Sequence, residues 1–120
     1  MDNTFVTIGV KNIVASTAFY KKVLGYEVAH EVKPAEHTHL VWIARKESLT
    51  IELVYQEQSG SFNNEPGSVM LTYVVADLSE YNHKLNKLGI PYQQVALGPG
   101  TEALRFQDPD GITISVVAHN

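Results

Sequence analysis

The sequence predicts an α+β domain of two βαβββ modules that pair into a curved, cup-like mixed sheet with helices outside. The prediction rests on an internal repeat, on helix boundaries at equivalent positions, and on a polar, turn-rich segment between the halves. We expect one domain over residues 1–120, with module one at about 1–56, a linker at about 57–68 and module two at about 69–120. Three pairs of equivalent positions give the register of the repeat: Val10 and Val75, Ile13 and Leu78, and Leu24-Gly25 and Leu88-Gly89.

In the first half, alternating apolar residues predict a strand at Phe5–Val10, and helical spacing predicts a helix at Ser16–Leu24. Ser16 is of a type that caps helix N-termini, and Gly25 suits the left-handed position that ends a helix. Three further strands complete the module: Tyr26–Val32, His39–Arg45 and Leu49–Tyr55.

The second half repeats this order, beginning with a strand at Val69–Val75. Its helix is capped by Asp77 or Ser79 and is ended by Gly89. A helical stripe of apolar residues supports it: Leu78, Tyr81, Leu85 and Leu88. The later strands are expected at Tyr92–Ala96, Glu102–Gln107 and Ile112–Ala118, with a turn at Asp108-Pro109-Asp110-Gly111 between the last two.

Composition excludes several classes of function. The chain is 44% hydrophobic and 18% charged, which is typical of a globular protein. Its net charge of −4 and scattered basic residues argue against a nucleic-acid partner. The absence of cysteine excludes disulfides, thiolate metal sites and a cysteine nucleophile. Without an apolar run of about 20 residues or a signal-peptide pattern, we expect a cytoplasmic protein with no membrane partner.

Three motifs, in order, span nearly the whole chain. They are Ala15-Ser16-Thr17-Ala18-Phe19-Tyr20 leading to Leu24-Gly25-Tyr26, then Ile51-Glu52-Leu53, and finally Phe106-Gln107-Asp108-Pro109-Asp110-Gly111. Together they resemble the vicinal oxygen chelate superfamily, also known as the glyoxalase, bleomycin-resistance and extradiol dioxygenase group. The resemblance implies two βαβββ modules, a ligand-binding cup and a homodimer.

The metal enzymes of that family place ligands at four equivalent strand positions. By this resemblance the positions fall on Phe5, Glu52, Met70 and Ser115, so that one carboxylate stands where several ligands are usual. A catalytic divalent ion needs about three protein ligands and an open site. We therefore predict no metal site and no cofactor.

Strand alternation divides the side chains between two faces of the sheets. The helix-facing set is strongly apolar: Val6, Ile8, Val10, Ile51, Leu53, Leu71, Tyr73, Val75, Ile114 and Val116, with Val41, Ile43, Leu104 and Phe106 from the third strands. The opposite face mixes hydroxyls, apolar groups and few charges, as small-molecule sites do. Its candidate ligand-binding residues are Phe5, Thr7, Trp42, Glu52, Met70, Thr72, Arg105 and Ser115.

Glu52 and Trp42 each admit two interpretations. Glu52 could bind a ligand cation or act as a base, or it could pair with Arg105 or with hydroxyls such as those of Thr50 and Thr72. Trp42 could stack on an aromatic or cationic ligand, or it could close the core.

The sequence thus favours a metal-independent, dimeric protein that sequesters a cationic or aromatic small molecule without catalysing a reaction. The alternative is a metal-dependent lyase, isomerase or dioxygenase of the same superfamily. Its atypical metal site would combine Glu52 with His30, His37 or His39.

Overall fold

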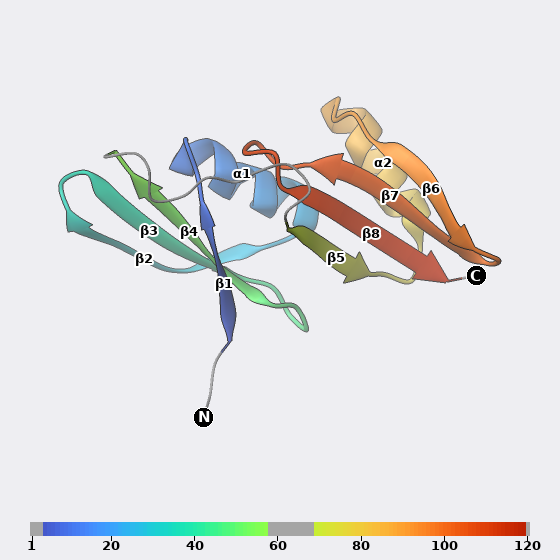
Figure 1. Ribbon diagram of the computed structural model, residues 1–120, viewed down its shortest axis with the longest axis horizontal. Coiled ribbons are helices and arrows are strands. Elements are labelled where there is room, and N and C mark those ends of the chain that lie inside the picture. Colours follow the sequence, from blue (N-terminus) through green and yellow to red (C-terminus); the bar gives the residue numbers. More distant parts are fainter. Residues whose placement is uncertain (1–3, 58–68, 120) are drawn as a thin grey trace. The chain divides into compact units, whose positions relative to one another are not determined.

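The computed structural model describes residues 4–57 and 69–119, which divide into two compact modules (Figure 1). The predicted linker lies outside the described residues, apart from Glu57. Module one contains β1 (Phe5–Gly9), α1 (Ile13–Leu24), β2 (Glu27–Ala35), β3 (Thr38–Ala44) and β4 (Thr50–Gln56). Module two contains β5 (Met70–Val74), α2 (Leu78–Leu88), β6 (Gln93–Gly98), β7 (Thr101–Gln107) and β8 (Thr113–His119).

Both modules have the same sheet topology. The strand order is β1-β4-β3-β2 in module one and β5-β8-β7-β6 in module two. In each module the first strand pairs in parallel with the fourth, and the remaining neighbours are antiparallel. The α+β fold class and the two βαβββ modules are therefore confirmed, while the pairing of both sheets into one cup stays a prediction.

The helix ends confirm most of the predicted caps and correct one. Helix α1 begins at Ile13 and not at Ser16, because the Asn12 side chain accepts a hydrogen bond from the Ala15 amide at 3.1 Å. Ser16 is fully buried inside the helix. Asp77 caps α2 as predicted, and both helices end at a left-handed glycine, with φ of 74° at Gly25 and 69° at Gly89.

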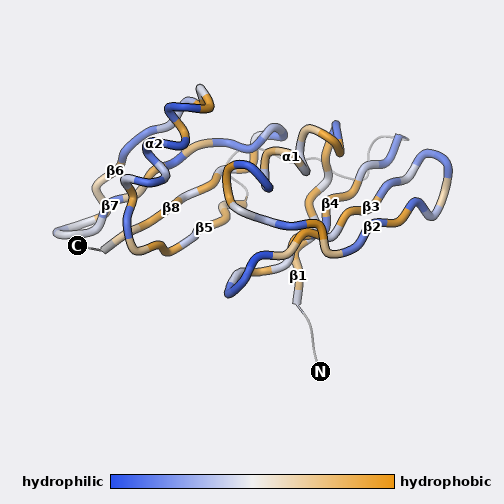
Figure 2. Tube along the Cα trace, turned by 180° about the vertical axis from the view of Figure 1, so that it is seen from behind, coloured by the Kyte–Doolittle hydropathy of each residue, from blue (hydrophilic) through white to orange (hydrophobic). Residues whose placement is uncertain are grey.

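Each helix covers one face of its own sheet. Helix α1 packs on β3 and β4, and α2 packs on β7 and β8. In Figure 2 much of β8 is coloured as hydrophobic, whereas α2 is largely hydrophilic. The predicted helix-facing residues supply the cores: Ile8, Val10, Val41, Ile43, Ile51 and Leu53 are buried in module one, and Tyr73, Leu104, Phe106, Ile114 and Val116 in module two. The other three, Val6, Leu71 and Val75, are half-buried.

The turn between β7 and β8 has the predicted sequence and a well-defined geometry. One carboxylate oxygen of Asp108 accepts hydrogen bonds from the Asp110 and Ile112 amides, at 2.9 and 2.8 Å. Gly111 adopts a φ of 87°, a conformation that a side chain would disfavour. Among the described residues, no helix has the length and apolarity to cross a bilayer.

Candidate functional site

A row of four side chains crosses the sheet of module one. The register pairs Thr7 with Glu52, Glu52 with Trp42, and Trp42 with His30, so that each of the four strands contributes one residue. Residues paired in register point to the same face of a sheet, and their neighbours in sequence point to the other. Because Ile51, Leu53, Val41 and Ile43 form the core with α1, the row lies on the face directed away from α1. We call these four residues the acidic–aromatic row.

The carboxylate in this row has a hydroxyl partner. Thr7 Oγ1 donates a hydrogen bond of 2.7 Å to Glu52 Oε1. The partner is thus a threonine hydroxyl, as one interpretation of the sequence expects, and it is that of Thr7. Glu52 is half-buried, which is compatible with a carboxylate that keeps contact with solvent while one oxygen is oriented by Thr7.

Trp42 lies in the middle of an aromatic cluster. The edge of Phe5 meets its ring, with centroids 6.4 Å apart and planes at 83°. On the other side, the His30 ring lies 5.5 Å away at 40°. Trp42 is half-buried and does not belong to the fully buried core, so part of its ring surface is accessible. Flat aromatic surface beside a carboxylate can bind an organic cation.

The sequence left the orientation of His30 open, and a β-bulge in β2 decides it. Val28 pairs with Ile43 on the α1 side, and strict alternation would place His30 on that same side. A shift of register between the two residues brings His30 opposite Trp42 instead. Bulges change the direction of a side chain in this way, and they leave little trace in an alternating pattern.

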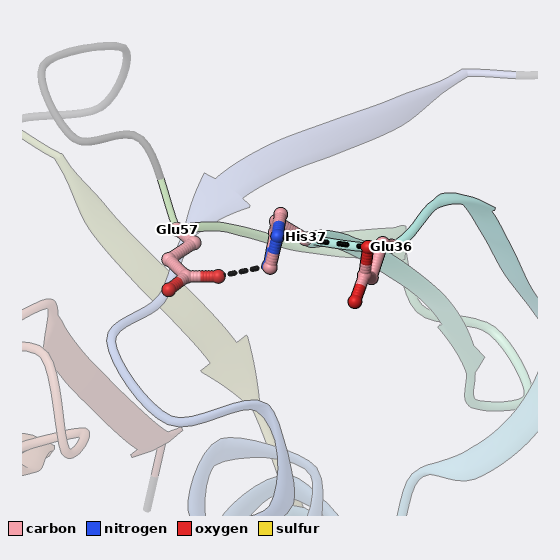
Figure 3. Close-up of polar contacts among 3 residues, drawn as sticks. All are labelled: Glu36, His37 and Glu57. Atoms are coloured by element: carbon pink, nitrogen blue, oxygen red, sulfur yellow. Dashed lines mark ion pairs between the residues drawn. The ribbon is translucent and has the colours of Figure 1, made fainter.

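The other two candidate histidines lie apart from the row. His39 points to the α1 side and contacts the Glu31 carboxylate through Nε2. His37, at the β2–β3 turn, lies between two carboxylates (Figure 3): its Nδ1 contacts Glu57, and its Nε2 is 3.9 Å from Glu36. Neither histidine therefore joins Glu52.

The side chains at the four equivalent positions offer few ligands for a divalent metal. Of the four equivalent positions, Phe5 has no donor atom, Met70 offers a weak thioether, Ser115 a hydroxyl and Glu52 a carboxylate. Within the row, Trp42 separates Glu52 from His30, so that the two lie two strand spacings apart, about 10 Å. Over residues 4–57 and 69–119, no group of three or more His, Asp or Glu residues could hold a metal ion. These residues do not fit a catalytic divalent metal.

Module two carries a corresponding row with different chemistry. Thr72 pairs with Ser115, Ser115 with Arg105, and Arg105 with Gln93. The predicted residues Thr72, Arg105 and Ser115 therefore share one face. Met70, opposite Thr113, lies two pairs along the ladder and so on the same face. Gln93 was not predicted, although its place early in the second strand of a module, like that of His30, could have indicated it.

Comparison with known proteins agrees with the topology. The family model described as the Glyoxalase/Bleomycin resistance protein/Dioxygenase superfamily matches residues 4–116. No curated protein matches the sequence.

Several solved structures share the fold at low identity. An antibiotic-binding protein from Streptomyces is 20% identical with a TM-score of 0.76, over 100% of this chain and 98% of that one. A manganese-bound fosfomycin resistance protein from Listeria monocytogenes is 17% identical with a TM-score of 0.81, over 99% of this chain and 92% of that one. The trypanothione-dependent glyoxalase I of Leishmania major is 22% identical with a TM-score of 0.78, over 98% and 87%. With the family model spanning nearly the whole chain, this protein belongs to the glyoxalase/bleomycin resistance protein/dioxygenase superfamily.

Proposed function

We propose that the protein sequesters a small organic molecule that carries a cationic group beside an aromatic or apolar part, without catalysing a reaction. The acidic–aromatic row is the observation that carries this proposal. Glu52 supplies one negative charge, and Trp42, the neighbour of Glu52 across the β3–β4 pair, supplies an aromatic surface. A cation held between a carboxylate and an indole is attracted electrostatically by both groups. The attraction is stronger where water is partly excluded.

The local structure supports a preorganised site. Thr7 orients one oxygen of Glu52, and Phe5 and His30 flank Trp42, so both ligand-facing groups have neighbours that restrict their rotamers. A ligand then spends less free energy on ordering the side chains that it contacts. The fold neighbour that binds an antibiotic makes a ligand-binding role reasonable for this chain. Met70, Thr72, Arg105 and Ser115 remain predicted ligand contacts in module two.

The chain offers a direct readout, because Trp42 is its only tryptophan. We would titrate the protein with benzyltrimethylammonium and follow Trp42 emission, with neutral benzyl alcohol as the matched probe. The expected result is a saturable change with the cation and none with the alcohol. Glu52→Gln should weaken binding about tenfold, which corresponds to the loss of about 1.4 kcal/mol of charge–charge attraction. Glu27→Gln, at an exposed position of β2, is the control.

Two outcomes would contradict the proposal. One is a lack of saturable response to this probe and to a panel of larger aromatic cations. The other is equal affinity in Glu52→Gln and in the unmodified protein. Titration in EDTA tests metal independence, because chelation should leave the binding curve unchanged.

The metal-dependent lyase, isomerase or dioxygenase remains the alternative, since two fold neighbours are a manganese-bound resistance protein and a glyoxalase I. It is tested by elemental analysis after loading with zinc, nickel, manganese or iron. About one metal per chain that disappears in Glu52→Ala would favour the enzyme. A homodimer is part of the main proposal, and light scattering of the purified chain measures it.

A further inference from the structure

Module two contains a cavity of its own, of about 740 Å³. It lies where the connection from α2 to β6 meets the end of β7 and the start of β8. Ile90, Pro91 and Phe106 give it apolar walls, while Arg105, Gln93 and Thr113 give it polar groups. Pockets that hold small organic molecules have volumes of about 300–1,000 Å³ and this mixture of walls, so the size and the lining fit a ligand.

Arg105 is the group that points to the chemistry of the ligand. Its Nε is buried and has no hydrogen-bond partner in the part of the chain that the structure describes. A buried donor on a charged group is costly to leave unpaired, and a guanidinium presents its N–H groups as a planar fork that matches a carboxylate or phosphate. A carboxylate or phosphate oxygen is the acceptor that would satisfy this donor and its positive charge together.

The charges that line the cavity, one on Arg105 and one on Asp108, favour an anion with a single negative charge. Asp108 is the carboxylate in the lining, and its Oδ1 already accepts two backbone amides, from Asp110 and Ile112. Those bonds hold Asp108 in the β7–β8 turn, but its negative charge still disfavours a multiply charged anion nearby. One guanidinium balances one charge, which favours a carboxylate over a phosphate dianion.

Neutral donors line the same cavity as the guanidinium. Gln93 is the direct partner of Arg105 across β6 and β7, and Thr113 lies on β8 opposite Gln107. A side-chain amide and a hydroxyl can each donate to a carboxylate oxygen. In the internal repeat Arg105 occupies the position that Trp42 holds in module one, so a cationic side chain in one module replaces an aromatic one in the other.

We propose that the Arg105 cavity of module two binds an organic monocarboxylate whose apolar or aromatic part packs against Ile90, Pro91 and Phe106. This site uses residues of module two alone. It assigns Arg105, one of the predicted ligand contacts, to an anion and not to the cation of the acidic–aromatic row. A test in each module therefore stands or falls separately.

The test uses the arginine Nε–Hε signals of the full ¹⁵N-labelled chain, because Arg45 and Arg105 are its arginines. We would titrate with benzoate, with benzyl alcohol as the neutral probe and with sodium chloride at matched ionic strength. The expected result is a saturable downfield shift of the Arg105 signal with benzoate alone, while the Arg45 signal stays in place. Arg105→Gln should abolish binding, and Arg105→Lys should retain at most about a tenth of the affinity, since lysine keeps the charge but not the fork.

Three outcomes would overturn the proposal. They are an unshifted Arg105 signal at saturating benzoate, an equal shift with chloride, and equal benzoate affinity in Arg105→Gln measured by calorimetry. The amide spectrum of each variant reports whether it folds. If Arg105→Gln does not fold, Gln93→Ala on the exposed edge strand β6 is the second variant, and unchanged benzoate affinity there together with an unshifted Arg105 signal rejects the site.

Discussion

Thr7 and Glu52 face each other across the parallel β1–β4 pair, and the threonine hydroxyl donates a 2.7 Å hydrogen bond to the carboxylate. The two residues are 45 positions apart in the sequence. Their contact therefore exists only when β1 has paired with the last strand of its module. The pairing of β1 with β4 therefore also orients the Glu52 carboxylate, which we propose to bind the ligand.

This contact should be measurable as a coupling energy. Thr7→Val removes the donor at nearly constant volume, and we expect it to lower the free energy of unfolding by about 1 kcal/mol. Valine also favours strands, which would hide part of the loss. A double-mutant cycle with Glu52→Gln and Glu52→Leu in urea unfolding separates the two effects. If the cost of Thr7→Val is the same in the Glu52→Leu background, the hydrogen bond contributes nothing.

The β7–β8 turn depends on the side-chain oxygen of Asp108. Asp108→Ala leaves the Asp110 and Ile112 amides without their acceptor, and the bond to Ile112 is buried. We expect a loss of about 1–3 kcal/mol of stability. Asp108→Asn keeps an oxygen in place and should lose less. Thermal unfolding of both variants compares them, and equal losses would show that the charge, and not the acceptor geometry, stabilises the turn.

The two candidate starts of α1 can be separated by mutation. Asn12→Ala removes the side-chain acceptor of the Ala15 amide and should cost about 1 kcal/mol. Ser16→Ala, inside the helix, removes no N-cap. Because Ser16 is fully buried, any cost there comes from packing and hydroxyl bonding. Helix content at moderate urea distinguishes the two, since only cap loss should fray the first turn of α1.

The cap of α2 predicts a dependence of stability on pH. The Ser79 amide, which donates to Asp77 at 2.9 Å, holds the pKa of the Asp77 carboxyl below its usual 3.8, and the Ser79 hydroxyl adds to this. A lowered folded-state pKa means that the ionised cap stabilises the protein fully above pH 3.8 and loses this effect as the pH falls through the folded value.

Asp77→Asn keeps an acceptor but cannot titrate. The difference in stability between the unmodified protein and Asp77→Asn should therefore shrink as the pH falls below 3.8. Urea unfolding across that range measures it. A difference that stays constant with pH would mean that the charge of Asp77 does not contribute to the cap.

The helix ends show which features of the fold the local sequence can predict. Gly25, Gly89 and Asp77 were recognised because each acts through its own conformation or through an amide close by in sequence. The sequence favours Ser16 as the cap of the first helix, although Asn12 is also a capping residue type. The choice between them depends on where the chain leaves β1 and turns into α1. The packing of α1 on β3 and β4 fixes that point.

By itself the sequence determined the two-module order, the turn at Asp108 and the shared face of Glu52 and Trp42, because these follow from periodicity and short-range chemistry. Only the tertiary structure decided that Thr7 binds Glu52, that a bulge turns His30 toward Trp42, and that the Arg105 Nε is buried without a described partner. These features depend on the register between strands that are distant in sequence. Register is set by packing across the whole sheet, which the pattern of any one strand does not contain.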